Sequence, residues 1–566
     1  MATLTHEVNT LQRPILKVST LFLDIKAGFD NVNASKLRSL LLSKNIPSYM
    51  VDWVSSFLTG RKCTLVFQGA PGIAAPVSVG TPQGSPLSPL LFLIYVAPLH
   101  FRIPKGVMVS YVDDFSLTVA SPSHRSNIRR LQGLFLYMSR RATELEVSFS
   151  VPKTELIHWR THSERSPPST LLITLDNQVF HPAEVVRWLG YWLSPALNTS
   201  HHFNHCLALA NASFSFVKRL SSPGGGTRPF LAHRVAMGLF LPILTYGADL
   251  LVPNHRTTQK MNSFWHWVCR WVTNNFHSTP TSILTCEACL PPVDAYCRHR
   301  RRLTALRIAC APPTHNPAAA RLPASFPSLS SFRALDSTRH LTKGLTSYYL
   351  PLDWRTPVPS PPMRKHLPID ALAHLTIPLS EGLSRFPLVL KVPPPPGENI
   401  PPPLLMSRTY KALKVRSQLL MVKEWDSLHP PPDYYEYPCR LSPHPFMGLD
   451  KFIAGRLHQM RAHKSYLAAH PSWWSEDPDT SCPRCRPNPE TFEHAILHCP
   501  AKSRQRDRYL EPSLSLRADS PLWDNKDHLH ALGQYLTATR TGFPSEMATS
   551  PLSSRPPSPS SPFSPA

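Results

Sequence analysis

Short apolar runs separated by turns fill the first part of the chain, to about residue 165. Val18–Asp24 (VSTLFLD) is rich in β-branched and apolar residues and ends at an acid, which is typical of a buried strand. Residues 107–120 (VMVSYVDDFSLTVA) carry two apolar runs around Asp113 and Asp114, which predicts a hairpin with acids at its tip. The pattern predicts strands mixed with helices in this region.

The rest of the chain divides by composition. Apolar and aromatic spacing predicts helices from about residue 166 to 310. Proline, 63 of the 566 residues, dominates the next stretch, which we interpret as a semi-rigid linker. The predicted regions are a region of mixed strands and helices at 1–165, a helical region at 166–310, a proline-rich linker at 311–405, a helical segment with a Cys/His cluster at 406–510, and a disordered Ser/Pro-rich tail at 542–566.

The net charge and the cysteine content narrow the range of possible binding partners and cellular environments. The formal net charge is +24, which favours a polyanionic partner and nucleic acid before a membrane surface. The longest apolar stretch is interrupted by Pro242, Gly247 and Asp249, so we expect no membrane span. Eleven cysteines do not form a dense disulfide framework, which favours a reducing, intracellular environment.

Two acidic positions are candidates for a cation site. Asp24 ends the first predicted strand, and Asp113 with Asp114 forms the hairpin tip. If the strands are neighbours, adjacent carboxylates favour a cation, and an all-oxygen site suits Mg²⁺. Simpler interpretations remain open: Asp24 as a helix cap, and the acid pair as ordinary turn residues. The loop between them, VGTPQGSPLSP at residues 79–89, contains glycines that let the backbone approach a ligand.

In the order of these motifs the chain resembles reverse transcriptases, and more narrowly the reverse transcriptases of non-LTR (LINE-like) retrotransposons. The resemblance rests on FLDIKAGFDNV, GTPQGSPLSP, YVDDF, the Lys153 segment SVPKTELIHW, and Leu189-Gly190 in VRWLGYWL. It implies an α+β fold: a right-hand polymerase palm with an antiparallel sheet and helices, a helical thumb or connection region, a proline-rich linker and a small zinc-binding C-terminal module. The activity implied is RNA-directed DNA polymerisation by two Mg²⁺ ions.

The resemblance also assigns roles. Asp24 and Asp113 are the expected metal ligands, with Asp114 as the neighbouring catalytic acid. Phe29 matches the residue that packs under the nucleotide sugar, although core packing remains an alternative. Gln83 and Gly84 match the template–nucleotide pocket. Lys153 matches a basic residue near the incoming triphosphate, although a solvated lysine remains an alternative.

The expected partners are an RNA template, a DNA primer or target and deoxynucleotides, and the expected location is the nucleus. Only 23 residues precede Asp24, so the fingers region of such polymerases is expected to be largely missing and the chain to be N-terminally truncated. Two other interpretations therefore stay open. One is a catalytically inactive remnant that only binds nucleic acid. The other is an RNA-templated RNA polymerase.

A second metal site is predicted near the C-terminus. Cys482, Cys485, His494 and Cys499 follow the spacing C-x2-C-x8-H-x4-C. Three thiolates and an imidazole suit tetrahedral Zn²⁺, and His498 is an alternative ligand. The cluster also resembles the C-terminal zinc segment of retrotransposon reverse transcriptases. Cys286 and Cys289 have the same C-x2-C spacing, but no convincing fourth ligand follows them, so a helix and turn are predicted there instead of a zinc site.

Basic residues gather in two predicted helices. These residues are Arg125, Arg129, Arg130, Arg140 and Arg141 in one, and Arg298, Arg300, Arg301, Arg302 and Arg307 in the other. Such groups give salt-sensitive, sequence-independent affinity for phosphates, and a solvated charged face is the alternative. We favour nucleic-acid contact because four arginines fall within five positions of the second helix.

Overall fold

The computed structural model describes two compact units, the first ending at His202 and the second beginning at Phe203. The described residues are 4–310 and 414–543, with gaps at 6–7, 9–10, 13–14, 105, 161–171, 221–225, 415–416, 419–420, 436, 438, 471–479 and 515–525. The linker predicted at 311–405 and nearly all of the predicted tail lie outside them. None of the described helices is both long and apolar enough to cross a bilayer.

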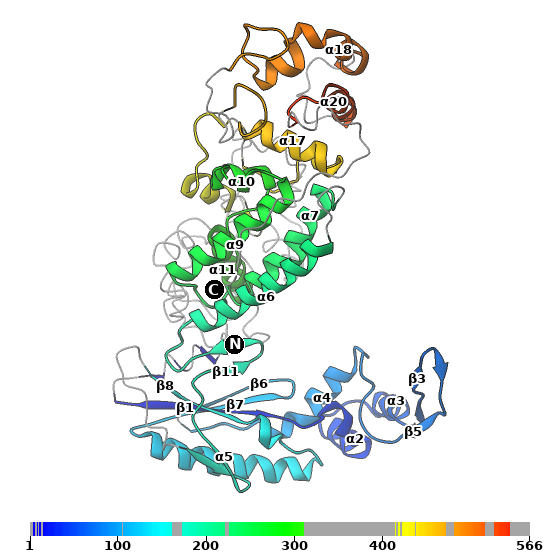
Figure 1. Cartoon of the computed structure of the whole chain (residues 1–566). Coiled ribbons are helices and arrows are strands. Elements are labelled where there is room, and N and C mark those ends of the chain that lie inside the picture. The colour runs from blue at the N-terminus through cyan, green and yellow to red at the C-terminus, as the bar shows by residue number, and fades with distance from the viewer. Residues whose placement is uncertain are drawn as a thin grey trace, which may run out of the picture. The chain divides into compact units, whose positions relative to one another are not determined.

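A four-stranded antiparallel sheet forms the centre of the first unit, with the order β6-β7-β1-β8 (Figure 1). Its strands are β1 (Lys17–Asp24), β6 (Gly106–Tyr111), β7 (Asp114–Ser121) and β8 (Glu155–Trp159). β1 is central, with β7 hydrogen-bonded along one edge and β8 along the other, and its interior residues are buried on both faces. This explains the unbroken apolar run in its sequence, and the predicted strand and hairpin are both confirmed.

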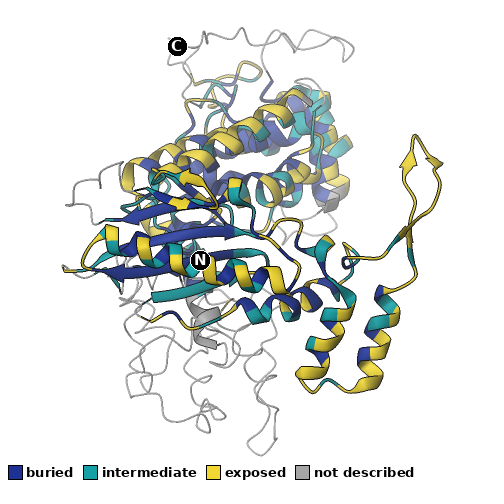
Figure 2. Ribbon diagram, turned by 90° about the horizontal axis from the view of Figure 1, so that it is seen from below, coloured by how far each residue is buried: buried dark blue, intermediate teal, exposed yellow. Residues whose placement is uncertain are grey.

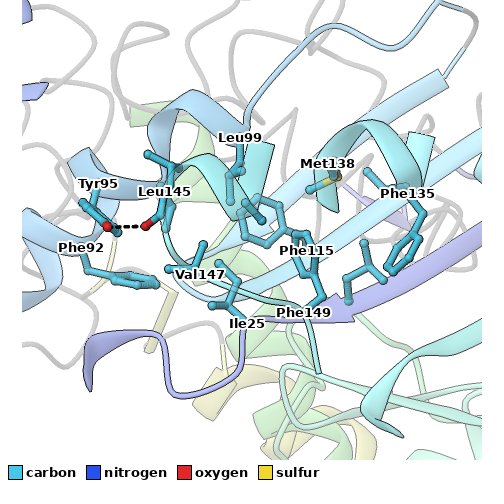
Figure 3. Packing of buried hydrophobic residues seen from close by; sticks show 14 of the residues in the cluster. Ile25, Phe92, Tyr95, Leu99, Phe115, Phe135, Met138, Leu145, Val147 and Phe149 are labelled. Atoms are coloured by element: carbon cyan, nitrogen blue, oxygen red, sulfur yellow. Dashed lines mark hydrogen bonds between the residues drawn. The ribbon is translucent and has the colours of Figure 1, made fainter. Parts of the chain in front are cut away.

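Helices pack along one face and beside one end of this sheet (Figure 1), and they complete the hydrophobic core. The helices of the unit are α2 (Ala34–Ser43), α3 (Ser48–Leu58), α4 (Ser88–Val96) and α5 (His124–Glu144), with short turns of 3-10 helix at Phe29–Asn31, Ala97–Leu99 and Val151–Lys153. α5 buries Ile128, Leu131, Phe135 and Met138, whose spacing of three and four places them on one face. That face packs on β1 and β7, beside Phe115 and Phe149 (Figure 3).

Small hairpins complete the first unit. Their strands are β2 (Arg61–Cys63) with β5 (Ala75–Val77), β3 (Val66–Phe67) with β4 (Ala70–Pro71), β9 (Ile173–Leu175) with β10 (Gln178–Phe180), and β11 (Val186–Trp188) with β12 (Tyr191–Leu193). Strands therefore occupy residues 173–193, where helices were predicted, and the helical region begins only at Ser200. Leu189 and Gly190, both with positive φ, form the tight turn between β11 and β12.

The second unit is helical. It contains α6 (Ser200–Leu220), α7 (Pro229–Val235), α8 (Leu241–Leu244), α9 (His255–Thr273), α10 (Thr281–Ala288), α11 (Val293–Cys310), α17 (Lys451–Arg461), α18 (Ser503–Tyr509), α19 (Glu511–Leu514) and α20 (Lys526–Thr539). Short helical turns of other types span Ala236–Phe240, Pro445–Gly448, His494–His498 and Pro500–Lys502. The predicted helix and turn near Cys286 is α10, which ends at Cys289 in a left-handed conformation.

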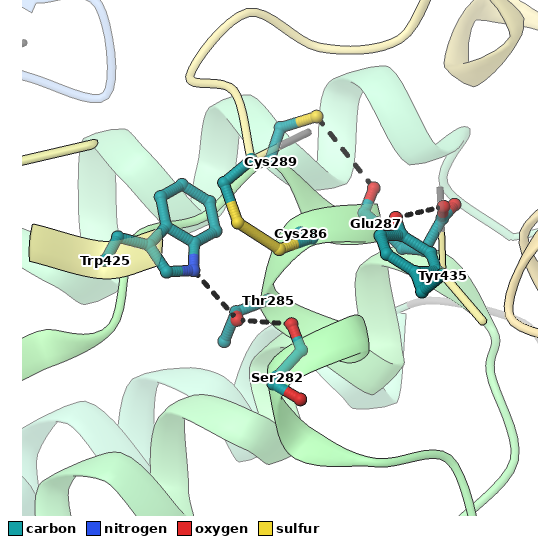
Figure 4. The surroundings of a disulfide bond; sticks show 8 residues. Ser282, Thr285, Cys286, Glu287, Cys289, Trp425 and Tyr435 are labelled. Atoms are coloured by element: carbon teal, nitrogen blue, oxygen red, sulfur yellow. Dashed lines mark hydrogen bonds between the residues drawn. A yellow bond between two sulfur atoms is a disulfide. The ribbon is translucent and has the colours of Figure 1, made fainter. Parts of the chain in front are cut away.

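A buried acid joins α10 to residues more than a hundred positions later. The Glu287 carboxylate accepts hydrogen bonds from the Tyr435 hydroxyl at 2.6 Å and from Arg461 Nε at 2.9 Å, and it lies 2.6 Å from His458 Nδ1. Burial alone would raise the pKa of Glu287, but the Arg461 charge and the His458 contact outweigh it and lower that pKa. A disulfide between Cys286 and Cys439 lies beside this contact (Figure 4).

The arginines of α11 serve the structure of this unit. Arg298 pairs with Asp294 at 3.1 Å and with Glu424 at 3.2 Å, and the buried Arg302 contacts the same Glu424. Arg301 is buried as well. The predicted phosphate-binding face of this helix is therefore wrong for these three residues. The sequence could not reveal the reason, because Glu424 follows α11 by more than a hundred positions.

Asp294 makes the stability of this unit depend on pH. Burial raises its pKa, but the hydrogen bond with His429 and the charge of Arg298 outweigh burial and lower the pKa to about 2. The stabilisation is complete above the unfolded value of about 3.9 and is lost as the pH falls through the folded value. We expect wild type to lose about 2 kcal/mol more unfolding free energy than Asp294→Asn between pH 5 and pH 2. Urea unfolding at both pH values measures this, and equal losses would contradict it.

Candidate functional site

Three acids lie at one end of the central sheet, where β1 ends and β7 begins. In the register of β1 and β7, Asp24 lies opposite Asp114. Asp113 occupies the turn between β6 and β7, and its carbonyl oxygen accepts a hydrogen bond from Ile25 N at 3.1 Å. The antiparallel pairing thus brings acids that are 89 positions apart to one end of the sheet.

The turn that holds Asp113 has an unusual backbone. Val112 has φ of 58°, and a β-branched residue rarely adopts this left-handed conformation. The cost of such a conformation is of order 1–3 kcal/mol and is tolerated where the surrounding structure fixes it. Here the β6–β7 ladder fixes both sides, because Tyr111 pairs with Asp114 directly across the turn.

The electrostatics of the acids favour a cation. Burial raises the pKa of Asp113, and the charge of Asp24 raises it further. Burial and the charges of Asp113 and Asp24 raise the pKa of Asp114 to about 6. The cost of ionising these groups together is what a bound cation would remove, and carboxylate oxygens are the donors that Mg²⁺ prefers. The donor set therefore fits the predicted magnesium site in its chemistry.

Lys153 lies against the same acids. Its Nζ donates to Asp24 Oδ2 at 2.9 Å, although the lysine side chain is 68% exposed. The hydrogen bond and charge of Asp24 raise the pKa of Lys153. Lys153 thus reaches the acids from the turn before β8, and it partly neutralises Asp24. Lys153 is therefore solvent-exposed, as the alternative interpretation has it, and also paired with Asp24.

The loop that follows β5 is joined to the turn after β1. Gly80 N donates to Val32 O at 2.9 Å, and Thr81 N donates to Phe29 O at 2.8 Å. Gly80 has φ of 83°, and a Cβ there would lie 2.8 Å from the Asp30 carbonyl oxygen, so only glycine fits without displacing backbone. These contacts place the loop beside the turn that follows Asp24.

The loop also carries the predicted nucleotide-pocket residues. Gln83 Nε2 donates to Asp30 Oδ1 at 2.9 Å, and Gly84 is exposed with φ of 87°. Phe29 is half-buried, and its ring stacks on Phe92 with centroids 4.7 Å apart. Phe29 therefore packs in the core through its contact with Phe92, and the exposed part of its side chain is accessible to solvent. Sequence reasoning missed the bond between Asp30 and Gln83, because the 53 positions between them carry no signal of a contact.

A second site in the other unit contains sulfur and nitrogen ligands. The ligand atoms of Cys482, Cys485, His494 and Cys499 all lie within 4.8 Å of one another. Cys485 Sγ is 3.1 Å from His494 Nε2, and Cys482 Sγ is 3.9 Å from Cys499 Sγ. Within the described residues this is the one group of three or more potential ligands that close together. The four residues could therefore hold a metal ion.

Local backbone bonds bring these four ligands together. Cys482 N donates to Asn488 O at 2.7 Å, which closes the turn that contains the first two cysteines. Cys499 N donates to His494 O at 2.7 Å and fixes the spacing of the other two ligands. His498, the alternative ligand, is outside the cluster: its ring is 64% exposed and lies 3.5 Å from Glu493. His494 is the histidine that the fold selects.

Comparison with known proteins identifies the first unit. Residues 2–193 match the family described as Reverse transcriptase (RNA-dependent DNA polymerase). These residues form a reverse transcriptase domain. The antiparallel sheet with its acids is the palm of that domain, as the sequence predicted. Reverse transcriptases generally use divalent metal ions, which agrees with the donor set described above.

Three curated relatives from Drosophila melanogaster carry the comparison further. The chain is 26% identical over 188 residues to the probable RNA-directed DNA polymerase from transposon X-element. It is 22% identical over 237 residues to the RNA-directed DNA polymerase from mobile element jockey. It is 25% identical over 211 residues to the probable RNA-directed DNA polymerase from transposon BS. The matches cover 32%, 40% and 35% of this chain. They support a LINE-like reverse transcriptase.

The matched segments span only 20%, 25% and 23% of the relatives' own lengths.

Among solved structures, the telomerase from Candida tropicalis with a fragment of telomeric RNA aligns with 54% of this chain and 49% of its own. Its sequence identity is 11% and its TM-score is 0.30, so we assign no residue role from that likeness.

Proposed function

We propose that this chain carries the RNA-directed DNA polymerase activity of a non-LTR retrotransposon. The observation that supports the proposal is the position of Asp24, Asp113 and Asp114 at the same end of the palm sheet, with Lys153 paired to Asp24. A site of this kind suits transfer of a nucleotidyl group, in which charge on a triphosphate must be held and neutralised.

Mg²⁺ is the ion that we propose for this site. Asp24 and Asp113 would hold it, and when bound it would stabilise charge that develops on the transferred phosphate. Asp114 would supply further negative charge beside the ligands, from its position opposite Asp24 in the sheet. Lys153 would orient Asp24 and offer an ammonium group to the phosphates of an incoming deoxynucleotide.

For the second site we propose Zn²⁺. Three thiolates and one imidazole at these mutual distances match a closed structural site with no open position. Such a site would hold the 482–499 segment in one conformation rather than take part in polymerisation.

Primer extension on an RNA template tests the polymerase proposal. Extension with deoxynucleotides supports it, whereas extension with ribonucleotides alone would indicate an RNA-templated RNA polymerase. Binding of primer–template without extension would indicate the inactive remnant. Extension that requires Mg²⁺ and stops on its removal would support the ion assignment.

Asp30 gives a finer test of the nucleotide pocket. Asp30→Ala removes the acceptor that holds Gln83, so we expect KM for the deoxynucleotide to rise roughly 5- to 10-fold with little change in kcat. Asp30→Asn is the matched control, because its amide oxygen can still accept the Gln83 bond and KM should stay near wild type. Steady-state extension kinetics measure both, and equal values for the two variants would contradict a role for this bond.

A further inference from the structure

A slender hairpin of the reverse transcriptase domain has no packing partner among the described residues. It consists of β2 with β5 and β3 with β4, residues 61–77, and is called the arm below. The turn at its tip has positive φ at Gln68 and Gly69, which matches the twist of a two-residue hairpin. Figure 2 shows the arm as an exposed ribbon that extends away from the helices. No residue of the arm is buried.

The outer part of the arm is apolar. Leu65 is 81% exposed, Phe67 76% and Ile73 96%, and Val66 is exposed beside them. A two-stranded hairpin that packs on nothing is marginal in water, and clustered exposed apolar groups mark interaction sites. These side chains therefore mark the outer part of the arm as a candidate interaction site.

The charge around the arm indicates what that partner is. No aspartate or glutamate occurs between Asp52 and Asp113, so the arm and its surroundings in the sequence carry only positive charge. Lys62 is exposed on β2. An apolar tip on an acid-free, basic stem complements a polyanion that also offers flat apolar surfaces, and unpaired nucleic-acid bases with their phosphates combine both.

The base of the arm is fixed to the loop at the catalytic site. Arg61 Nη2 donates to Gly80 O at 2.6 Å and to Val79 O at 3.0 Å, and Arg61 Nε donates to Leu58 O at 2.9 Å. Gly80 is in turn bonded to Val32, close to Asp24 in the chain. The base of the arm is therefore joined through Gly80 to the turn that follows Asp24.

We propose that the arm binds an unpaired nucleic-acid strand, with Phe67 stacked on a base and Lys62 on a phosphate. This proposal rests on the proposed function, because the strand is the one that the polymerase would copy. Stacking of aromatic side chains on bases is tolerant of sequence, so the arm would hold any template. Lys62 would add an affinity that falls with salt.

Fluorescence anisotropy of the full chain with a labelled 20-nucleotide single strand and with a blunt duplex tests the proposal. Phe67→Ser should weaken single-strand binding about 5- to 100-fold, as loss of one stacked aromatic does, and change duplex binding much less. Lys62→Gln should reduce the salt slope of single-strand binding by about 0.7. Val179→Ser, an exposed apolar position on the hairpin strand β10, is the matched control and should bind as wild type.

The outcomes separate this proposal from the proposed function. If wild type binds the strand and Phe67→Ser binds equally well, the arm proposal is wrong and the polymerase proposal is untouched. If Phe67→Ser weakens binding but wild type extends no primer, the arm proposal holds and the polymerase proposal fails. If wild type self-associates and Phe67→Ser abolishes only that, the arm is a protein interface and the proposal is overturned. If wild type binds no single strand at all, the arm proposal is overturned too. Thermal unfolding of each variant checks the fold.

Discussion

Replacing Asp113 with asparagine should abolish primer extension while leaving the domain folded. The carboxylate is a proposed metal ligand, and the charge stabilisation that one metal supplies is worth several kcal/mol, so we expect a loss of three or more orders of magnitude in rate. Burial and Asp24 raise the pKa of Asp113, which means that its charge opposes folding. The neutral amide should therefore unfold at the same temperature as wild type or slightly above it.

Single-turnover extension and thermal unfolding measure the two effects. Asp176→Asn is a suitable control, because Asp176 is exposed in the β9–β10 turn with φ of 44° and asparagine accepts that conformation. Extension by Asp113→Asn at the wild-type rate would remove Asp113 from the site. A large loss of stability in this variant would mean that the carboxylate supports the fold instead.

Removing the metal from the Cys/His cluster should unfold its part of the helical unit. We expect one Zn²⁺ bound per chain, and Cys482→Ser should lose it because one of four ligands is gone. Structural zinc contributes on the order of 10 kcal/mol of apparent binding free energy in small domains, so its loss is a loss of local folding. The effect should reach α20, because Tyr535 donates to Ala495 O within the cluster segment.

Metal analysis and hydrogen exchange of the full chain measure this prediction. Cys63→Ser is the matched control, because Cys63 is a free and exposed cysteine in the other unit. A chain that contains no zinc when prepared with zinc present, and whose cluster cysteines all react with an alkylating agent in the native state, would contradict the site. Equal exchange in α20 with and without the metal would show that the cluster does not support it.

Local patterns in the sequence determined much of the palm and the two metal-site candidates. β1 and the β6–β7 hairpin follow from apolar runs that end at acids, because a buried strand needs apolar side chains and a turn favours Asp. The three cysteines of the Cys/His cluster follow from spacing, because two tight turns bring neighbours in sequence to one point, whereas the fold decided between His494 and His498. In each case the determining contacts are local, so the sequence records them.

The tertiary structure decided the contacts between distant residues. Lys153 on Asp24, Gln83 on Asp30 and Glu424 on the arginines of α11 each join residues more than 50 positions apart. The sequence around a charged residue is the same whether its side chain contacts water, a phosphate or a buried acid. Its role depends on which element packs against it. In α11, packing buries the guanidinium groups of Arg301 and Arg302, and Arg302 contacts an acid. The sequence of this helix predicted a binding surface, but in the structure these residues belong to the core of their unit.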